Sequence, residues 1–338
     1  MPGPLLDTLK GVKQPVAPIW LMRQAGRYLP EYRELRAEKG GFLELVYDSE
    51  AAAEITVQPL RRFGFDGAIL FSDILIVPHA MGQGLEFLAG EGPKLSPTLL
   101  EVELDSFEAA FERFEPVYET VRRTRAMISD RVTMLGFAGS PWTVATYMIA
   151  GEGSKDQGPA RLLAYRDPAH MQAICDAIAD VSITYLRGQI DAGAEAVQLF
   201  DSWSGSLAPD EFERWVVGPN AKITAAIKQS HPDTPVIGFP KGAGAKLPAY
   251  ARETGVDAVG LDETLDPAWA HASLPEGMPV QGNLDPLLVE AGGPALPARC
   301  KAILDAFEDR PHVFNLGHGI GQFTPIDHVE ELLTAVRG

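Results

Sequence analysis

Short runs of apolar residues alternate with longer amphipathic stretches along most of the chain. Each run is unbroken, whereas a strand with one face in water alternates apolar and polar residues. Unbroken runs are typical of parallel strands, which are buried on both faces. The pattern therefore predicts eight strands, over residues 17–22, 67–72, 132–138, 195–200, 235–239, 258–261, 279–282 and 312–316.

The stretches between these runs carry the signals that begin and end helices. Asp48 precedes an amphipathic segment over residues 51–62, and Gly64 follows it. Pro168 stands at the start of a long helical pattern that stops near Gly193. A capping side chain or a proline at the start and a glycine at the end are the usual boundaries of a helix.

Strands that alternate with helices are joined by right-handed crossovers into a parallel sheet. Eight of them favour one closed (β/α)₈ barrel, a TIM barrel, as a single α/β domain over residues 1–338. Helical additions are expected at about 28–47 and 141–165. The alternative is an open doubly wound sheet, but that fold usually carries a glycine fingerprint after its first strand. Residues 23–27 contain no such fingerprint.

The chain has 46 acidic and 29 basic residues, which gives a formal net charge of −17. A field of that sign repels nucleic acid and anionic membranes, so neither is an expected partner. An anionic small molecule would need a local basic cluster. The first ten residues, MPGPLLDTLK, lack the basic flank and apolar run of a secretory signal, and two cysteines make no disulfide framework. We therefore expect a cytoplasmic protein.

Three other kinds of site are not expected. The uncharged stretch 132–151 is as long as a membrane span, but glycines and a proline interrupt it, so it predicts a strand, a turn and a helix. Cys175 and Cys300 fall on apolar helical stripes and predict core residues rather than zinc ligands. The glycine-rich segments 240–246 and 317–321 do not match the phosphate-binding pattern GxxxxGK[ST].

In a (β/α)₈ barrel the residues after each strand line the active site. Arg23 and Arg27 follow the first run, four residues apart. If this turn is helical, they lie on the same side and can bind carboxylates bidentately. The alternative is a solvated basic face that pairs with Glu31 and Glu34.

Acidic and imidazole groups follow other predicted strands. Asp73 comes between two apolar runs, so we expect dry surroundings for its carboxylate; the alternative is a helix N-cap. His318 stands between two glycines, which bring its backbone close to whatever fills the site. Tyr147 lies shortly beyond the third run. The predicted site thus combines basic, acidic, phenolic and imidazole groups, without a cluster of metal ligands.

Seven segments at these strand ends share a further property. They are MRQAGRYLPEYR (22–33), FSDILIVP (71–78), GFAGSPWTVATYM (136–148), QLFDS (198–202), GFPKG (238–242), QGNLDP (281–286) and FNLGHGI (314–320). Together they strongly resemble the uroporphyrinogen decarboxylase family of tetrapyrrole biosynthesis, over nearly the whole chain. The resemblance implies a cofactor-free barrel, usually a homodimer, which removes CO₂ from the four acetates of uroporphyrinogen III to give coproporphyrinogen III for haem synthesis.

The resemblance also implies roles for individual residues. It makes Asp73 the carboxylate that faces the pyrrole NH groups and stabilises a cationic intermediate, and it points to Arg23 as the proton donor. His318, Tyr147 and a bound water are the alternative donors. Asp201 and Trp203 stay unassigned, because this chain has DSW where some members of the family have ESH. The residues implied to bind substrate are Arg23, Gln24, Arg27, Asp73, Phe137, Tyr147, Phe200, Ser202 and His318.

Two other functions compete with this expectation. Relatives of this barrel act as zinc- or corrinoid-linked methyltransferases, which would need His and Cys ligands at the strand ends. A non-catalytic porphyrin-binding protein could use His318 as an axial ligand to haem. Such a carrier has no evident use for Asp73 in dry surroundings.

Overall fold

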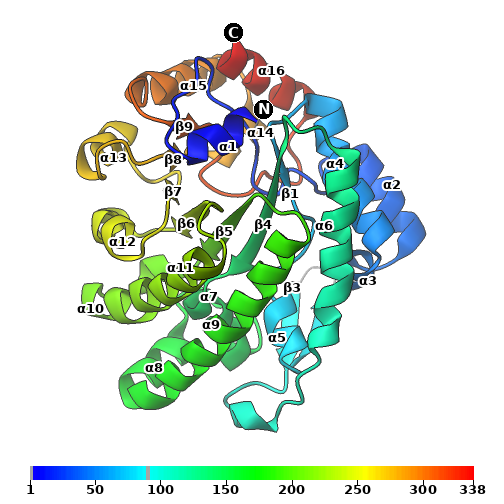
Figure 1. Ribbon diagram of the computed structural model, residues 1–338, viewed down its shortest axis with the longest axis vertical. Coiled ribbons are helices and arrows are strands. Elements are labelled where there is room, and N and C mark those ends of the chain that lie inside the picture. Colours follow the sequence, from blue (N-terminus) through cyan, green and yellow to red (C-terminus); the bar gives the residue numbers. More distant parts are fainter. Residues whose placement is uncertain (1–2, 89–91) are drawn as a thin grey trace.

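The computed structural model describes residues 3–88 and 92–338, so the first two residues of the predicted 1–338 domain lie outside the described part. Its centre is a curled, parallel sheet of seven strands in the order β1-β4-β5-β6-β7-β8-β9 (Figure 1). The strands are β1 (Gly67–Ile69), β4 (Thr133–Gly139), β5 (Ala196–Asp201), β6 (Val236–Pro240), β7 (Ala258–Gly260), β8 (Val280–Gln281) and β9 (His312–Val313).

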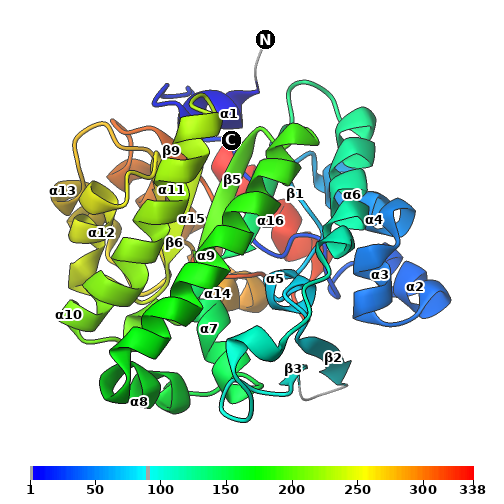
Figure 2. The same cartoon turned by 60° about the horizontal axis from the view of Figure 1, so that its bottom comes forward.

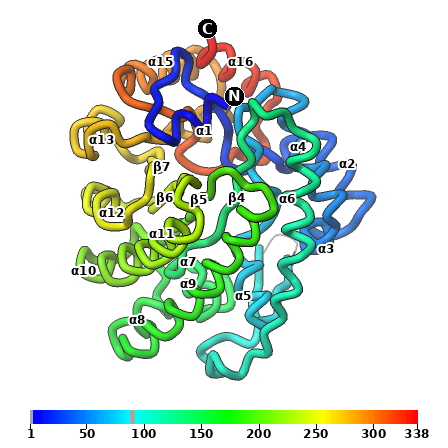
Figure 3. The backbone as a smooth tube through the Cα atoms, in the orientation of Figure 1, coloured from blue at the N-terminus to red at the C-terminus, as the bar shows by residue number. Residues whose placement is uncertain are grey.

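Helices surround the sheet, broadly in the order of the sequence, as the colours of Figure 3 show. They are α1 (Pro4–Leu9), α2 (Pro30–Lys39), α3 (Phe42–Tyr47), α4 (Ser49–Phe63), α5 (Ile76–Ala80), α6 (Glu115–Met127), α7 (Pro141–Ala150), α8 (Gly158–Arg166), α9 (Pro168–Asp191), α10 (Pro209–Phe212), α11 (Gly218–Ser230), α12 (Leu247–Glu253), α13 (Pro267–Ser273), α14 (Pro286–Ala291), α15 (Ala295–Ala306) and α16 (Ile326–Arg337). Arg337 on α16 donates hydrogen bonds to the backbone carbonyls of Phe63 and Gly64. The last helix therefore returns to the end of α4.

Seven of the eight predicted runs form strands of this sheet, but the first does not. Residues 17–22 contribute a single bridge, between Ile19 and Phe314. The Phe314 N–H donates to the Pro18 carbonyl at 2.8 Å on one side, and the Asp66 N–H donates to the Ile19 carbonyl at 2.9 Å on the other. The Asp66 carboxylate accepts the Ile19 N–H, so a side chain takes the place of a strand partner. The described residues therefore form an open, curled sheet of seven strands rather than the predicted closed sheet of eight.

Polar side chains tie residues 17–22 to the opposite part of the sheet. The Trp20 indole N–H donates to the Gln281 amide oxygen at 2.9 Å, and the Gln281 amide donates to Gln198 at 3.0 Å. All three side chains are buried. Because an unpaired buried amide is costly, these bonds fix the segment against β5 and β8.

A two-stranded antiparallel hairpin, β2 (Gly84–Leu88) with β3 (Gly92–Ser96), was not among the predicted elements. Figure 2 shows it at the same end of the molecule as α5 and α8, opposite α1. The Leu95 N–H donates to the Gly151 carbonyl at 2.7 Å, which attaches the hairpin to the end of α7. The hairpin thus lies near the carboxyl ends of β1 and β4, as a sheet of its own.

The predicted helix boundaries are confirmed. The Asp48 carboxylate accepts the backbone N–H of Ala51 at the start of α4, and Gly64 ends that helix in the left-handed region, with φ 64°. The Asp167 carboxylate accepts the His170 N–H at the start of α9. Each cap satisfies a backbone N–H group that the first turn of a helix leaves without a partner.

The predictions for residues 132–151 and for the cysteines are also confirmed. The uncharged stretch forms β4 and α7. Across residues 3–88 and 92–338, no helix is long and apolar enough to cross a bilayer. Cys175 and Cys300 are free and buried, as expected of core residues.

Candidate active site

The carboxyl ends of the parallel strands lie at one end of the sheet, and the segments after them carry the predicted site residues. In Figure 2 this is the end that bears α5 and the hairpin. Asp73 follows β1, Tyr147 lies on α7 after β4, Ser202 follows β5, and His318 lies beyond β9. The four residues therefore lie on segments at one end of the sheet.

Asp73 lies partly buried in the turn between β1 and α5. Its Oδ1 atom accepts the Leu75 N–H at 2.8 Å, and its Oδ2 atom has no hydrogen-bond partner among the described residues. Leu75, rather than Asp73, precedes α5, so the alternative role as a helix N-cap is not realised. Desolvation raises the pKa of Asp73 to about 6, against the opposing effects of the Leu75 hydrogen bond and the Arg23 charge.

Gly139, the last residue of β4, makes room for the turn that carries Asp73. A Cβ atom at this position would lie 2.9 Å from the Cβ of Ile74 and 2.7 Å from a methyl group of Val144. Both distances are shorter than real carbon contacts. The missing side chain therefore lets the turn after β1 pack against the end of β4.

Arg23 has the strained backbone expected at a functional site. Its φ of 62° is in the left-handed region, which a residue with a side chain rarely adopts. Its side chain passes over Gly319, where an added Cβ would lie 2.3 Å from the Arg23 Cδ. The Arg23 charge acts on Asp73, Tyr147 and His318, so the structure brings these four groups within electrostatic range of one another.

His318 is partly buried in a positive environment. Desolvation, followed by the charges of Arg23 and Lys241, lowers its pKa to about 3, and Asp262 opposes this effect. The imidazole is therefore neutral at pH 7 and can donate one hydrogen bond and accept another.

Tyr147, on α7, lies within range of the Asp73 and Arg23 charges. Burial raises the pKa of its hydroxyl; the nearby Asp73 carboxylate adds to this, and the neighbouring Trp203 side chain and the Arg23 charge oppose it. Its ring lies beside that of Trp203, with 6.4 Å between the ring centroids. Tyr147 therefore remains a neutral hydroxyl group that can donate a hydrogen bond.

Ser202 and the two predicted phenylalanines complete this edge of the sheet. Ser202 is half-buried in the turn after β5, and its hydroxyl has no hydrogen-bond partner within the described residues. Phe137 on β4 and Phe200 on β5 pack edge to face, with 5.5 Å between ring centroids and an interplanar angle of 87°. Phe200 makes a similar contact with Phe239 on β6, at 6.0 Å. The three rings form an apolar cluster at the same end of the sheet as Asp73, Tyr147 and His318.

Gln24 is enclosed by the fold. Its side chain is 0% exposed, its Oε1 accepts the Leu21 N–H at 3.0 Å, and its Nε2 donates to the Gly67 carbonyl at 2.8 Å. These bonds fix the turn over residues 21–24, which contains Arg23, against the start of β1. The Gln24 amide is therefore buried and bound to the backbone rather than exposed at the edge of the sheet.

Arg27 is exposed, and the helical turn expected for residues 23–27 is not present. The segment is a series of turns, so a spacing of four residues does not align Arg27 with Arg23. The predicted alternative, an ion pair with Glu31, is also not realised, because both carboxylate oxygens of Glu31 bind Arg62 at 2.9 Å. Within the described residues, Arg27 is not part of an ion pair.

The structure adds a second cation beside His318. Lys241, directly after β6, pairs with Glu263 at 3.3 Å, and its charge lowers the pKa of His318. The Glu263 Oε2 atom is buried without a partner. Lys241 and Asp262 follow the apolar runs 235–239 and 258–261, but that position alone does not indicate that either acts on His318.

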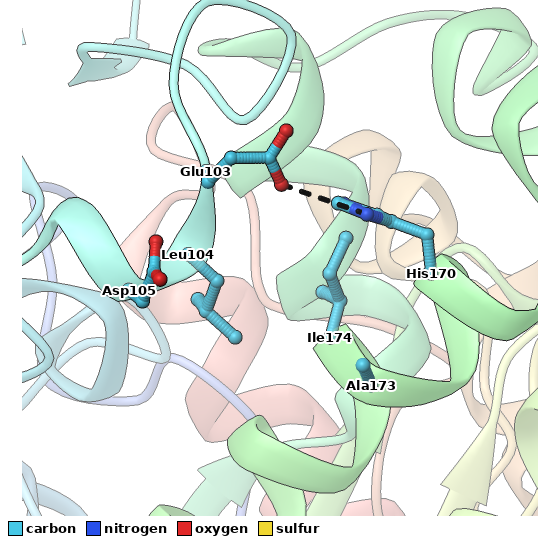
Figure 4. A pocket seen from close by; sticks show the side chains of 6 residues that line it. All are labelled: Glu103, Leu104, Asp105, His170, Ala173 and Ile174. Atoms are coloured by element: carbon cyan, nitrogen blue, oxygen red, sulfur yellow. Dashed lines mark ion pairs between the residues drawn. The ribbon is translucent and has the colours of Figure 1, made fainter.

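Two surface pockets lie away from these residues. Figure 4 shows one of about 350 Å³, in which His170 of α9 forms an ion pair with Glu103 over an apolar floor that includes Ile174. The other, of about 520 Å³, contains Tyr47 and His79, which are hydrogen-bonded at 2.7 Å. None of the predicted site residues lines either pocket. Over residues 3–88 and 92–338, no group of three or more His, Cys, Asp or Glu side chains is arranged to hold a metal ion.

Solved structures share the fold of this chain at low sequence identity. A methyltransferase from Methanosarcina mazei superposes with a TM-score of 0.80 and 18% identity, over 98% of this chain and 96% of the other. A putative vitamin-B12 independent methionine synthase from Listeria monocytogenes gives a TM-score of 0.57 and 14% identity, over 95% and 94% of the two chains. At such identities the likeness establishes a TIM-barrel-like architecture and no shared chemistry.

Curated relatives are far more similar in sequence. A uroporphyrinogen decarboxylase from Erythrobacter litoralis is 70% identical over 337 residues, which cover 100% of this chain and 99% of the relative. One from Novosphingobium aromaticivorans is 70% identical over 338 residues, with the same coverage. The sequence model of the family described as "Uroporphyrinogen decarboxylase (URO-D)" matches residues 3–338. The chain belongs to the uroporphyrinogen decarboxylase family.

Proposed function

We propose that this protein is a carboxy-lyase that converts uroporphyrinogen III to coproporphyrinogen III by removing CO₂ from its four acetate side chains. The observation that carries the proposal is the electrostatic coupling of Arg23 with Asp73, Tyr147 and His318 at the end of the sheet. A methyltransferase is not favoured, because the relatives at 70% identity are named uroporphyrinogen decarboxylases.

An acetate on a pyrrole loses CO₂ only when its bonding electrons have an acceptor. Protonation of the adjacent ring carbon creates this acceptor as a delocalised cation. The free Oδ2 atom of Asp73 would accept hydrogen bonds from the pyrrole NH groups and stabilise that cation. A charge pair ~4 Å apart at an effective dielectric of ~20 contributes about 4 kcal/mol. Enzymes lower barriers by ~8–23 kcal/mol, so several groups must cooperate.

We expect the substrate's carboxylates to bind cationic side chains and its macrocycle to pack on an apolar surface. We assign Arg23 and Arg27 to the carboxylates, because guanidinium groups bind them in a bidentate manner. Phe137 and Phe200 provide the apolar floor for the macrocycle, while Ser202, Tyr147 and His318 supply hydrogen bonds. For Gln24 we propose a positioning role, since its amide holds the turn that contains Arg23 against β1.

We propose Arg23 as the positioned proton donor. Its guanidinium gives up a proton only at considerable cost, which the Asp73 carboxylate nearby would not relieve. His318 is the less suitable donor, because at pH 7 its imidazole has already lost the acidic proton. We expect His318→Asn to retain measurable turnover in an anaerobic assay, with a loss of about tenfold from the missing hydrogen bond. Complete loss of turnover in a folded His318→Asn variant would instead make His318 the donor.

The proposed assembly is a homodimer in the cytoplasm, with a small-molecule substrate and no cofactor. These four points follow from membership of the family. We also propose that residues 17–22 act as the eighth member of the barrel, since their backbone carbonyls accept hydrogen bonds from Phe314 on one side and from Asp66 on the other.

The decisive experiment is anaerobic incubation of the purified, chelator-treated protein with uroporphyrinogen III, followed by mass spectrometry of the product. We expect four CO₂ losses per macrocycle without added metal. Asp73→Asn is the matched control, because it keeps the shape of the side chain and removes its charge. Intact substrate, or full activity only after metal is restored, would overturn the proposal.

A further inference from the structure

Asp201, the last residue of β5, is a buried carboxylate that the proposed reaction does not use. It is 0% exposed and forms no ion pair within the described part of the chain. Burial raises its pKa to about 7, although hydrogen bonds from Thr143 and Asn220 oppose the effect. A carboxylate buried without a cation destabilises the fold, so stability alone is a poor reason for its presence.

The carboxylate begins a chain of hydrogen bonds. The Thr143 hydroxyl donates to the Asp201 Oδ1 at 2.6 Å, and the backbone N–H of Trp203 donates to the Thr143 Oγ1 at 3.1 Å. The Thr143 hydrogen thus points to Asp201, and a lone pair of the Thr143 oxygen is left for the Trp203 N–H. Asp201 therefore sets the direction of the Thr143 hydroxyl.

The other side of the carboxylate is held as well. The Asn220 side chain on α11 donates to the Asp201 Oδ2 at 3.4 Å, and its own oxygen accepts the Ser140 hydroxyl at 2.9 Å. Asp201 thus connects the ends of β4 and β5 with the start of α11. This leaves its carboxylate little freedom to move.

The chain of contacts ends at Tyr147. Thr143 and Tyr147 are four residues apart on α7, so they lie on the same face of that helix. The backbone N–H of Trp203 is bound to Thr143, and the Trp203 ring packs beside the Tyr147 ring, with 6.4 Å between the ring centroids. The bond to Thr143 therefore helps to hold the Trp203 ring against Tyr147.

We propose that Asp201, Thr143 and Trp203 are positioning residues that orient the Tyr147 hydroxyl for the reaction. The inference rests on the role of Tyr147 in the proposed function. In this proposal the buried Asp201 carboxylate holds the Thr143 hydroxyl in the orientation in which its oxygen accepts the Trp203 N–H. None of the three has to touch the substrate to affect turnover.

The test combines Thr143→Val with Tyr147→Phe in a double-mutant cycle. Thr143→Val keeps the shape of the side chain but removes the hydroxyl. We expect kcat to fall roughly tenfold while KM stays within about twofold, because a misplaced group lowers the rate of the chemical step more than binding. Thr143→Ser should restore kcat. In the Tyr147→Phe background, Thr143→Val should cause no further loss.

Thr146→Val is the matched control. Thr146 is a buried threonine on the same helix, and its hydroxyl binds only the Thr143 carbonyl, at 2.7 Å. We expect it to leave kcat unchanged. Trp203→Phe removes the indole N–H from a half-buried ring and serves as a second variant if Thr143→Val does not fold; it should show the same dependence on Tyr147.

The outcomes separate the two proposals. If Tyr147→Phe is impaired but Thr143→Val and Trp203→Phe are not, the positioning role is overturned and the role of Tyr147 stands. Equal losses in both backgrounds would show a general structural effect and also overturn it. Full activity of Tyr147→Phe would instead overturn the role assigned to Tyr147 in the proposed function.

Discussion

At the scale of single residues, environment separates two acid–base groups that share one edge of the sheet. The pKa of Asp73 is raised to about 6, and that of His318 is lowered to about 3. At pH 7 the first is therefore mainly a carboxylate, and the second is a neutral imidazole. Groups whose pKa values are pushed apart in this way take different roles in a reaction.

The pKa of Asp73 predicts how activity depends on pH. As the pH falls through about 6, Asp73 gains a proton and can no longer balance a cationic intermediate. We expect kcat/KM to decrease about tenfold per pH unit below this point. A pH–rate profile between pH 5 and 8, measured anaerobically, checks this. A profile that stays flat down to pH 5 would contradict the assigned role of the charge.

Asp73 should also lower the stability of the free protein. A carboxyl group has a pKa near ~3.9 in an unfolded chain. Between about pH 4 and 6 the folded state therefore binds more protons than the unfolded state, so stability falls as the pH rises through this range.

We accordingly expect Asp73→Asn to be about 3 kcal/mol more stable than the natural protein at pH 7 and no more stable near pH 4. Urea unfolding at the two pH values measures this. The same variant should lose most activity, whereas Asp73→Glu should keep part of it. Comparable activity of the two variants would show that the reaction does not depend on the Asp73 charge.

The sequence predicted which residue types stand at the strand ends, but not the direction in which each side chain turns. Arg23, Asp73 and His318 lie together because strand position fixes their place. Gln24 is a neighbour of Arg23 and yet turns into the fold to bind Gly67. Lys241 was visible after β6, but its effect on His318 depends on a loop conformation that one sequence does not specify.

At the scale of elements, seven predicted strands are confirmed because their apolar runs are buried on both faces. Residues 17–22 have the same pattern for another reason. Trp20 and its neighbours are buried by side-chain contacts, and the Asp66 carboxylate takes the place of a strand at Ile19. Hydropathy reports burial, and it does not distinguish a hydrogen-bonded strand from an extended segment in the same position.

The close packing of β4 against the turn after β1 gives a prediction for Gly139. Gly139→Ala places a Cβ atom 2.9 Å from Ile74, next to Asp73, so the turn must shift. We expect kcat/KM to fall by about 10- to 100-fold, the size of effect that small displacements of catalytic groups produce. Gly218→Ala is the control, because its added Cβ would lie 3.8 Å from the nearest atom. Equal activity of the two variants would contradict the prediction.

At the scale of the whole molecule, the rim near the site exposes apolar side chains. Leu287 on α14 is 69% exposed and Phe323 is 75% exposed. The loop before Phe323 runs along α14, since a Cβ at Gly321 would lie 2.5 Å from Glu290. Large exposed apolar groups are typical of protein interfaces, so we propose that Leu287 and Phe323 lie in the interface of the proposed homodimer.

We expect Leu287→Glu combined with Phe323→Glu to convert the proposed dimer into monomers, because each change puts a charge into an apolar contact. Sedimentation velocity measures the assembly. Val12→Glu is the control, since Val12 is 53% exposed beside α1, at the opposite end of the molecule. A natural protein that sediments as a monomer, or a double variant that stays dimeric, would contradict this interface.

The bonds that hold residues 17–22 join the two extremes of the polypeptide. Trp20 and Gln281 are 261 positions apart, and Met22 and Asn315 are 293 apart. During synthesis residues 17–22 leave the ribosome well before Gln281 and Asn315 do. The Trp20 indole N–H therefore lacks its partner until the chain has grown past Gln281. We expect nascent chains to complete this part of the core only after Asn315 has left the ribosome.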